Sequence, residues 1–240
     1  MPATTTTFQK STIREYFESI VIAVILALFV RTWVVQAFKI PTGSMENNLL
    51  IGDHLLVNKF VFGPSTTGLE RALLPVRDIR RGDVIVFKYP DEPDRDFIKR
   101  VIGLPGETVE LRNKKVYING QPLDEPYVHF LEPAGESQEV TSFDVRERYG
   151  PARVPDVPEA KEPHYFVMGD NRDNSQDSRY WGFLPRSYVK GKALMIYWSY
   201  ESGREDYLDE GFGATVKQLF SVITHFFTKT RWSRLFHQIH

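Results

Sequence analysis

Three segments of this chain carry side chains that could do covalent or acid–base chemistry, and the first contains Ser44. Its hydroxyl follows Gly43, and a glycine allows a tight turn and close approach of a substrate backbone. The chain has no cysteine, so thiol nucleophiles, disulfides and cysteine zinc sites are excluded. A serine after a glycine is also typical of an ordinary turn, so Ser44 alone indicates little.

The second segment is the apolar run around Lys99. If residues 97–102 form a strand, Lys99 shares one face with Phe97 and Val101. Removal from water lowers the pKa of an ammonium group, and a lysine can then act as a general base near neutral pH. Arg100 cannot take this role because its guanidinium stays protonated. An edge-strand lysine that reaches solvent is the alternative for Lys99.

The third segment, residues 169–179, reads Gly-Asp-Asn-Arg-Asp-Asn-Ser-Gln-Asp-Ser-Arg and is followed by Tyr-Trp-Gly. So many Asx, Ser and Arg residues predict a loop that hydrogen bonds to itself. A calcium loop fails on spacing, because Arg172 stands third from Asp170 where an oxygen ligand is needed. A Ser/His/Asp triad is a further alternative, although no spacing selects one of its possible histidines, His54, His129 and His164.

The elements that must position these side chains are mainly β. Apolar runs of strand length are bounded by turn residues and predict short antiparallel strands. A stretch with five prolines and many glutamates, residues 132–163, predicts an extended excursion. The net charge of -1 gives no basic surface for nucleic acid. The predicted strands are residues 83–88, 97–102, 108–112, 116–118 and 193–198.

An apolar stretch, residues 19–38, precedes the β region. As a helix it would be about 30 Å long, the thickness of a bilayer core, and we interpret it as a transmembrane anchor. Arg31 lies near its end, where the guanidinium can reach the interface. A cleaved secretory signal ending at Ala37 is the main alternative, although Glu15 and Glu18 dilute its basic region. A core helix of a soluble domain is the third possibility.

The last part of the chain changes character again. Between residues 213 and 240 there are four Lys or Arg residues and no acid. Apolar residues within 216–227 recur at the spacing of one helical face, which predicts a basic amphipathic helix. Binding to a membrane surface and packing on the domain are both open for this helix.

Together, in this order behind an apolar anchor, the three segments resemble type I signal peptidase, the membrane-bound Ser/Lys protease family of bacteria. The run at residues 169–179 with its Tyr-Trp-Gly carries the resemblance, and Ile-Lys-Arg-Val-Ile-Gly-Leu-Pro-Gly supports it. The resemblance covers about residues 17–200. It implies an antiparallel β-sheet catalytic domain of the signal-peptidase type, with one N-terminal transmembrane helix and a C-terminal amphipathic helix. The expected domains are a tail at 1–16, an anchor at 17–38, a catalytic β domain at 39–205 with its excursion at about 131–163, and a tail at 206–240.

The resemblance also implies the site. Ser44 would be the nucleophile, Lys99 its general base, and Ser175 would hydrogen bond to Lys99 and orient it. The Ser44 N–H and the Thr42 hydroxyl would form the oxyanion hole, at a position where the family often has Ser. No metal or cofactor is implied. Structural support falls on Gly169, Asp170, Asp177 and Arg179, and substrate binding on Ile40, Pro41, Met45, Leu49, Phe97 and Ile98.

The implied activity is removal of signal peptides from exported preproteins, through an acyl-enzyme and with cleavage after small residues of the Ala-x-Ala type. The implied enzyme is a monomer in the cell membrane with its N-terminus in the cytoplasm, and its partners are signal peptides and the bilayer, not nucleic acid. Glu46-Asn47-Asn48 departs from the Pro-containing stretch of many members, with an open effect on specificity. An inactive β-rich binding protein and a self-cleaving repressor are the rival classes. Loss of Ser44 or Lys99 would indicate an inactive binding protein. A helix-turn-helix region in place of the anchor would indicate a self-cleaving repressor.

Overall fold

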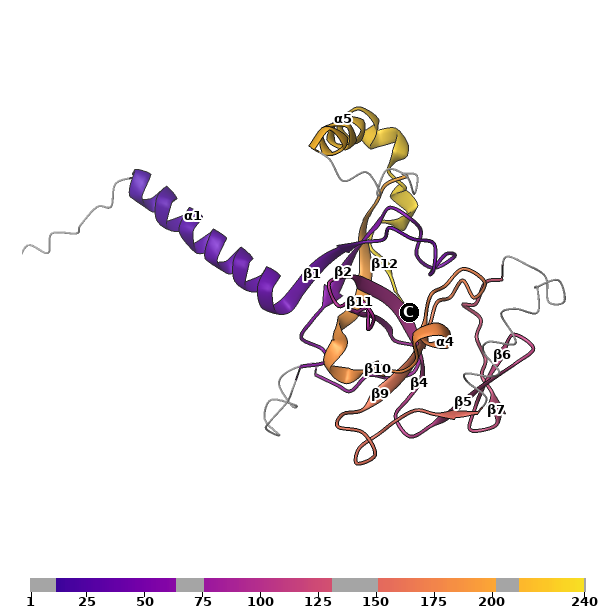
Figure 1. Cartoon of the computed structure of the whole chain (residues 1–240). Coiled ribbons are helices and arrows are strands. Elements are labelled where there is room, and N and C mark those ends of the chain that lie inside the picture. The colour runs from indigo at the N-terminus through magenta and orange to yellow at the C-terminus, as the bar shows by residue number, and fades with distance from the viewer. Residues whose placement is uncertain (1–11, 64–75, 131–150, 202–211, 240) are drawn as a thin grey trace, which may run out of the picture.

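The computed structural model describes residues 12–63, 76–130, 151–201 and 212–239. Two β-sheets form the body of the molecule, and helix α1 (Thr12–Phe29) extends away from them (Figure 1). The predicted N-terminal tail up to residue 11 and residues 131–150 of the predicted excursion lie outside the described part of the chain. The described residues of the excursion, 151–163, are turns and one two-residue strand.

The larger sheet joins strands from the beginning, middle and end of the chain. All of its named pairs are antiparallel, and its central strand, β11, pairs with three others. Its order is β1 (Val35–Lys39), β2 (Asp53–Asn58), β11 (Val189–Ser199), β3 (Val84–Lys88), β4 (Asp96–Gly103), β9 (His164–Met168) and β10 (Leu184–Pro185), while β12 (His237–Gln238) also pairs with β11. The sheet therefore depends on pairing between residues far apart in the sequence.

The smaller sheet is built around a tight hairpin. Asn113 and Lys114 both have positive φ angles, which suits the two-residue turns that connect antiparallel strands. Its order is β7 (Gln121–Pro122), β6 (Lys115–Ile118), β5 (Thr108–Arg112) and β8 (Ala152–Arg153). Buried side chains of both sheets, among them Ile102, Val109 and Phe166, share one core cluster. This packing joins the smaller sheet to the strand that carries Lys99.

The prediction of a mainly antiparallel β domain is confirmed, and each of the five predicted strands lies within or overlaps an observed one. Strands β2 and β9 were not predicted. In β2 the buried face carries Asp53 beside Leu55 and Val57, so its hydrophobic pattern is incomplete. Helix α4 (Ser178–Trp181) was not predicted either, and it is a single turn at the end of the polar loop.

The interpretation of residues 19–38 as one helix is wrong at its end. Helix α1 stops at Phe29, a π-helical turn (η1, Val30–Val34) follows, and the chain continues as β1. Strand β1 pairs along its whole length with β2, from Val35 opposite Asn58 to Lys39 opposite His54. These ladder hydrogen bonds replace the helical ones. Within the described ranges, no helix has the combination of length and apolar character needed to cross a membrane, so the predicted anchor at 17–38 is not supported.

The end of the chain is only partly as expected. The predicted amphipathic helix at 216–227 lies within α5 (Phe212–Lys229). The expectation of a tail as far as residue 240 fails for residues 230–239, which return to the larger sheet through the short helix η4 (Trp232–Arg234) and strand β12. Ile239 is 8% exposed and belongs to the core cluster of Ile40 and Leu55. A local pattern could not show this, because the return contact is made with distant strands.

The junction between the sheets generates a prediction about stability. A Cβ atom added at Gly103 would lie 2.5 Å from Cγ2 of Val109 and 2.9 Å from Cβ of Phe166. Because both neighbours belong to a packed core, Gly103→Ala should lower the free energy of unfolding by about 1–3 kcal/mol, measured by urea denaturation. Gly63→Ala is the control, since its Cβ would meet only one backbone oxygen, at 3.1 Å. Equal losses in the two variants would contradict the proposed crowding.

Candidate active site

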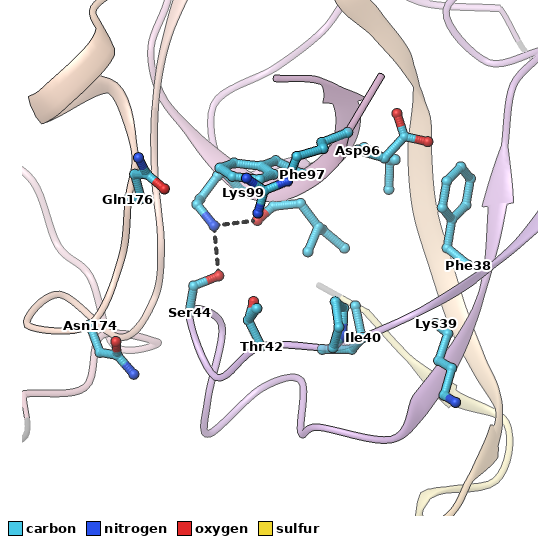
Figure 2. Close-up of a pocket in the computed structure, with 14 residues that line it drawn as sticks. Phe38, Lys39, Ile40, Thr42, Ser44, Asp96, Phe97, Lys99, Asn174 and Gln176 are labelled. Atoms are coloured by element: carbon cyan, nitrogen blue, oxygen red, sulfur yellow. Dashed lines mark hydrogen bonds between the residues drawn. The ribbon is translucent and has the colours of Figure 1, made fainter. Parts of the chain in front are cut away.

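Ser44 and Lys99 meet inside the larger sheet. Ser44 lies in a tight turn between β1 and β2, and Lys99 lies on β4. The Lys99 Nζ donates a hydrogen bond to Ser44 Oγ at 2.6 Å and another to the Ile98 carbonyl at 3.0 Å (Figure 2). The exposed fractions are only 7% for Ser44 and 3% for Lys99. Two residues separated by 55 positions are therefore held in a hydrogen bond that is largely shielded from water.

The turn that carries Ser44 is anchored by apolar side chains. The Leu49 N–H donates to the Met45 carbonyl at 2.8 Å, as in one turn of a helix. Met45 and Leu49 therefore point to the same side, where both are 0% exposed and pack in the main core. The structure does not place these two predicted substrate-binding residues at the cavity. They fix the turn from beneath.

Burial changes the acid–base behaviour of Lys99. Desolvation lowers the pKa of the Lys99 amine to about 8, and the negative charge of Asp177 opposes this only in part. Among the described residues no carboxylate forms an ion pair with Lys99. In its neutral form, the amine is in position to accept the Ser44 proton along the same 2.6 Å contact.

The polar loop at 169–179 is organised around Asp177. Its carboxylate accepts hydrogen bonds from the Gly169 N–H at 2.9 Å, the Ser175 hydroxyl at 2.8 Å and Arg179 Nε at 2.8 Å. Burial alone would raise the pKa of Asp177, but the Arg179 charge and these donors hold it below its usual value. The self-bonded loop predicted from the sequence is present, and Asp177 and Arg179 form its ion pair.

Ser175 differs from the sequence-based expectation. Its hydroxyl donates to Asp177, while Lys99 Nζ donates to Ser44 Oγ and to the Ile98 carbonyl. The predicted hydrogen bond between Ser175 and Lys99 is therefore not formed in this structure. A buried carboxylate is a stronger acceptor than an amine, so the Ser175 proton is directed to Asp177.

Gly169 allows the loop to reach the Ser44 turn. A Cβ atom there would collide with the Ser175 side chain and with the Ser44 carbonyl oxygen. Close contact is also made by Asn171, whose N–H donates to the Ser44 carbonyl at 3.2 Å and whose Nδ2 donates to the Gly43 carbonyl at 3.2 Å. Asn171 was missed as a site residue, although it belongs to the same dense polar motif.

A second buried ion pair connects the loop with β4. Arg100 donates from Nε to Asp170 Oδ1 at 2.8 Å and from Nη2 to Oδ2 at 2.7 Å. These two residues are 2% and 1% exposed. Asp170 Oδ2 also accepts from Asn48 Nδ2 at 2.6 Å, so one carboxylate ties the Ser44 turn to the residue next to Lys99. The sequence predicted Asp170 as structural support but assigned no function to Arg100 or Asn48.

A cavity of about 490 Å³ opens in front of Ser44 and Lys99 (Figure 2). The predicted binding residues Ile40, Pro41, Phe97 and Ile98 line it, together with Thr42. Seven further lining residues were not predicted from the sequence, and five of them are charged or amide side chains. They are Phe38, Lys39, Val86, Arg95, Asp96, Asn174 and Gln176.

Two hydrogen-bond donors lie close to the Ser44 hydroxyl: the hydroxyl of Thr42, which lines the same cavity, and the backbone N–H of Ser44 itself. In Figure 2 the Thr42 hydroxyl points in the direction of the Ser44 hydroxyl. Neither the Thr42 hydroxyl nor the Ser44 N–H is used in a hydrogen bond with the rest of the described chain. Both groups are therefore available to a developing oxyanion.

The histidine alternatives are not assembled around Ser44. The His54 ring contacts the Gly52 carbonyl, and the His164 ring contacts the Glu162 carbonyl. The contact of His129 with the polar loop is made by its backbone, which donates to the Asp170 carbonyl. Over the ranges that the structure describes, no histidine is hydrogen bonded to Ser44.

A serine hydroxyl hydrogen bonded to a buried amine, with free donors beside it in an open cavity, defines the site of a serine hydrolase. The family model for signal peptidase, peptidase S26, matches residues 13–198. A signal peptidase I from Pseudomonas aeruginosa is 38% identical over 209 residues, covering 78% of this chain and 72% of the relative. A signal peptidase I from Aquifex aeolicus is 36% identical over 231 residues, covering 78% and 84%.

A signal peptidase I from Bacillus licheniformis is 32% identical over 200 residues, covering 83% of this chain and 96% of the relative. A solved signal peptidase I from Enterococcus faecalis is 36% identical, covers 48% of this chain and 97% of that chain, and has a TM-score of 0.37. The chain belongs to the signal peptidase family, peptidase S26, and is a serine peptidase of the type I signal peptidase group.

The buried amine generates a prediction about stability and pH. The folded pKa of Lys99 is about 8 and lies below its ordinary value of 10.5, so the unfolded chain binds more protons between these two values. The free energy of unfolding of the wild type should therefore rise with pH in this window. Relative to Lys99→Met, which has no amine, the wild type should gain roughly 2–3 kcal/mol between about pH 7 and pH 10.

Urea denaturation of both proteins at several pH values measures this difference. Other titrating groups contribute to both proteins and cancel in the comparison. Parallel curves for the wild type and Lys99→Met would show that the Lys99 amine titrates at its ordinary pKa.

Proposed function

We propose that this chain removes N-terminal signal peptides from exported preproteins, with Ser44 as nucleophile and Lys99 as general base. The observation that carries the proposal is the 2.6 Å hydrogen bond between the two buried side chains, in a chain of this peptidase family. The relatives named above are signal peptidases, which supports preproteins as the substrate class.

The reaction would proceed through an acyl-enzyme. Ser44 Oγ attacks the carbonyl carbon of the scissile bond while neutral Lys99 takes its proton. The negative oxygen of the tetrahedral intermediate is stabilised by the Ser44 N–H and the Thr42 hydroxyl. Lys99 then gives the proton to the leaving amine, and a water activated by the same amine releases the second product.

Ser175 would support the site indirectly, through Asp177, because its hydroxyl donates to that carboxylate. The positive charge of Arg179 neutralises the Asp177 carboxylate, so this carboxylate does not compete for the Lys99 proton. We assign Ser175 and Asp177 as positioning residues and not as proton carriers.

The cavity suits a substrate with small side chains next to the cut. Apolar walls close to Ser44 are formed by Ile40, Phe97 and Ile98. The Phe97 ring is stacked on the Tyr89 ring, with 4.4 Å between the ring centroids. A wall fixed in this way restricts the space available to a large side chain. The proposed specificity is therefore cleavage after small residues of the Ala-x-Ala type.

The enzyme would work at a lipid surface. Helix α1 has no buried residue, and large apolar side chains such as Ile22 and Ile25 are 65% and 62% exposed. Exposed apolar surface of this extent is typical of membrane or protein interaction sites. On α5, Phe226 and Phe227 are also exposed, at 37% and 79%, so this helix would add a second contact with the lipid.

The pair of site residues gives the main test. Ser44→Ala and Lys99→Arg should each abolish cleavage of a preprotein by the detergent-solubilised enzyme, because arginine keeps the charge but cannot accept a proton. The double variant should be no worse than either single variant, since the two groups act as one unit. Thermal unfolding serves as the control for folding. Normal turnover by Lys99→Arg would exclude the amine as base and reopen the histidine alternatives.

The same reaction has an expected pH dependence. Below the folded pKa of about 8, Lys99 is protonated and cannot accept the Ser44 proton. The kcat/KM of the wild type should therefore rise with pH through about 8 and then level off. A single rise centred near the ordinary histidine pKa of about 6.5 would contradict the assignment.

Helix α1 gives the test of membrane association. Ile22→Asp combined with Ile25→Asp should lower binding of the protein to lipid vesicles at least about tenfold, because a buried aspartate costs about 2.5–3.5 kcal/mol in a bilayer. Glu18→Gln is the control, since it changes a charge without removing apolar surface. Cleavage of a soluble peptide should stay unchanged, and so should the Ser44–Lys99 geometry. Unchanged vesicle binding would show that α1 does not hold the enzyme at the lipid.

A further inference from the structure

Residues 230–239, here called the closing segment, lie beyond the 13–198 range of the family match and pack against the turn that carries Ser44. Strand β12 in this segment pairs with β11, and the Phe236 N–H donates to the Ile196 carbonyl at 2.7 Å. In Figure 1 this part of the chain returns from α5 to the sheet near β2 and β11. The segment therefore adds a short strand to the larger sheet, close to the turn that carries Ser44.

Arg234 makes the central contact of the closing segment. Its guanidinium donates from Nε to Asp53 Oδ1 at 3.1 Å and from Nη2 to Asp53 Oδ2 at 2.6 Å. The same Nη2 donates to the Asn48 carbonyl at 2.8 Å. Asp53 is 0% exposed, and its Oδ2 also accepts from the Leu50 N–H at 2.8 Å. One guanidinium thus holds Asn48, in the loop between Ser44 and β2, and Asp53, the first residue of β2.

These contacts continue to the catalytic pair. The Asn48 N–H donates to the Met45 carbonyl at 3.2 Å, and its side chain donates to Asp170. Asp170 is bound in turn by Arg100, the neighbour of Lys99. Arg234 therefore fixes the end of a short turn whose other end carries Ser44.

Apolar packing supports the same placement. Ile239 shares a core cluster with Met45 and Leu49, the two residues that anchor the turn from beneath. Arg231 donates from Nη1 to the Ile51 carbonyl at 3.0 Å. The closing segment thus contacts the loop after Ser44 both through its core face and through its polar groups.

We propose that Arg234 is a positioning residue for Ser44, acting through Asp53 and Asn48. It touches neither substrate nor reacting atoms in this arrangement. It fixes the turn so that Ser44 Oγ stays on the Lys99 amine, and small displacements of a nucleophile lower the rate of the chemical step strongly. This inference rests on the proposed function, because it assumes that Ser44 is the nucleophile.

Arg234→Gln in the full chain tests the proposal. The variant should lower kcat at least about tenfold and leave KM within about twofold, because Arg234 does not line the cavity that would hold the substrate. Arg234→Lys should recover part of kcat, since a lysine keeps the charge but cannot bind Asp53 and Asn48 in the same forked geometry.

Arg77→Gln is the matched control. Arg77 also forms a bidentate ion pair with an aspartate, Asp83, through two hydrogen bonds of 2.7 Å each. The exposed fraction of its side chain, 24%, is close to the 18% of Arg234. Both Gln variants should lose thermal stability to a similar extent, while only Arg234→Gln should lose kcat. Equal losses of kcat in the two variants, or unchanged kcat in Arg234→Gln, would overturn the proposal.

Backbone hydrogen exchange gives a readout that does not need activity. In Arg234→Gln the amides of Leu49 and Leu50 should exchange faster, while that of Val57 in β2 should stay protected. Failure of the wild type to cleave a preprotein would contradict the proposed function and not this contact. In that case the exchange still tests the structural part of the proposal: faster exchange at Leu49 and Leu50 shows that Arg234 orders the Ser44 turn, and unchanged exchange overturns it.

Discussion

The structure depends on excluding water from one side-chain amine, that of Lys99. A lysine with no carboxylate partner in a water-poor site loses the stabilisation of its charged form, which lowers the pKa of Lys99 to about 8. Such an amine destabilises the fold at neutral pH, so the surrounding structure must supply the compensation. Phe97 on one side and the Ser44 turn on the other provide the enclosure, and the Ile98 carbonyl and Ser44 accept its hydrogen bonds.

The same constraint explains the density of ion pairs around the site. Two buried carboxylates, Asp170 and Asp177, are close enough to influence Lys99, and each would raise its pKa. Each is paired with its own arginine, Arg100 and Arg179. Removing one partner of such a pair would leave an uncompensated buried charge, a loss of about 3–5 kcal/mol. The pairs therefore do two things: they fix the loop and β4, and they keep the acids from binding the Lys99 proton.

The sequence located the two side chains that meet in the site better than it located the residues that hold them there. Ser44, Lys99 and the loop around Asp177 carry motifs or strand patterns that are local, so they could be found one segment at a time. Three features could not be found in this way: the direction in which the Met45 side chain points, the hydrogen-bond partner of Ser175, and the residue at which β1 begins. These depend on contacts with distant residues: the core beneath the turn, the competing Asp177 carboxylate and the pairing of β1 with β2. Arg234 gave no signal, because its aspartate partner is 181 positions away.

The remaining question is why a site of two side chains needs four separate parts of the chain. Ser44 lies on a turn, and a turn has no ladder hydrogen bonds of its own to hold it. Its position must come from groups outside it: Asn171 of the polar loop at its start, and, in our proposal, Arg234 of the closing segment at its end. Lys99 lies on a strand with partners on both sides and needs no such support. Ser44, the nucleophile in our proposal, is thus the part of the site whose geometry depends most on residues outside the cavity.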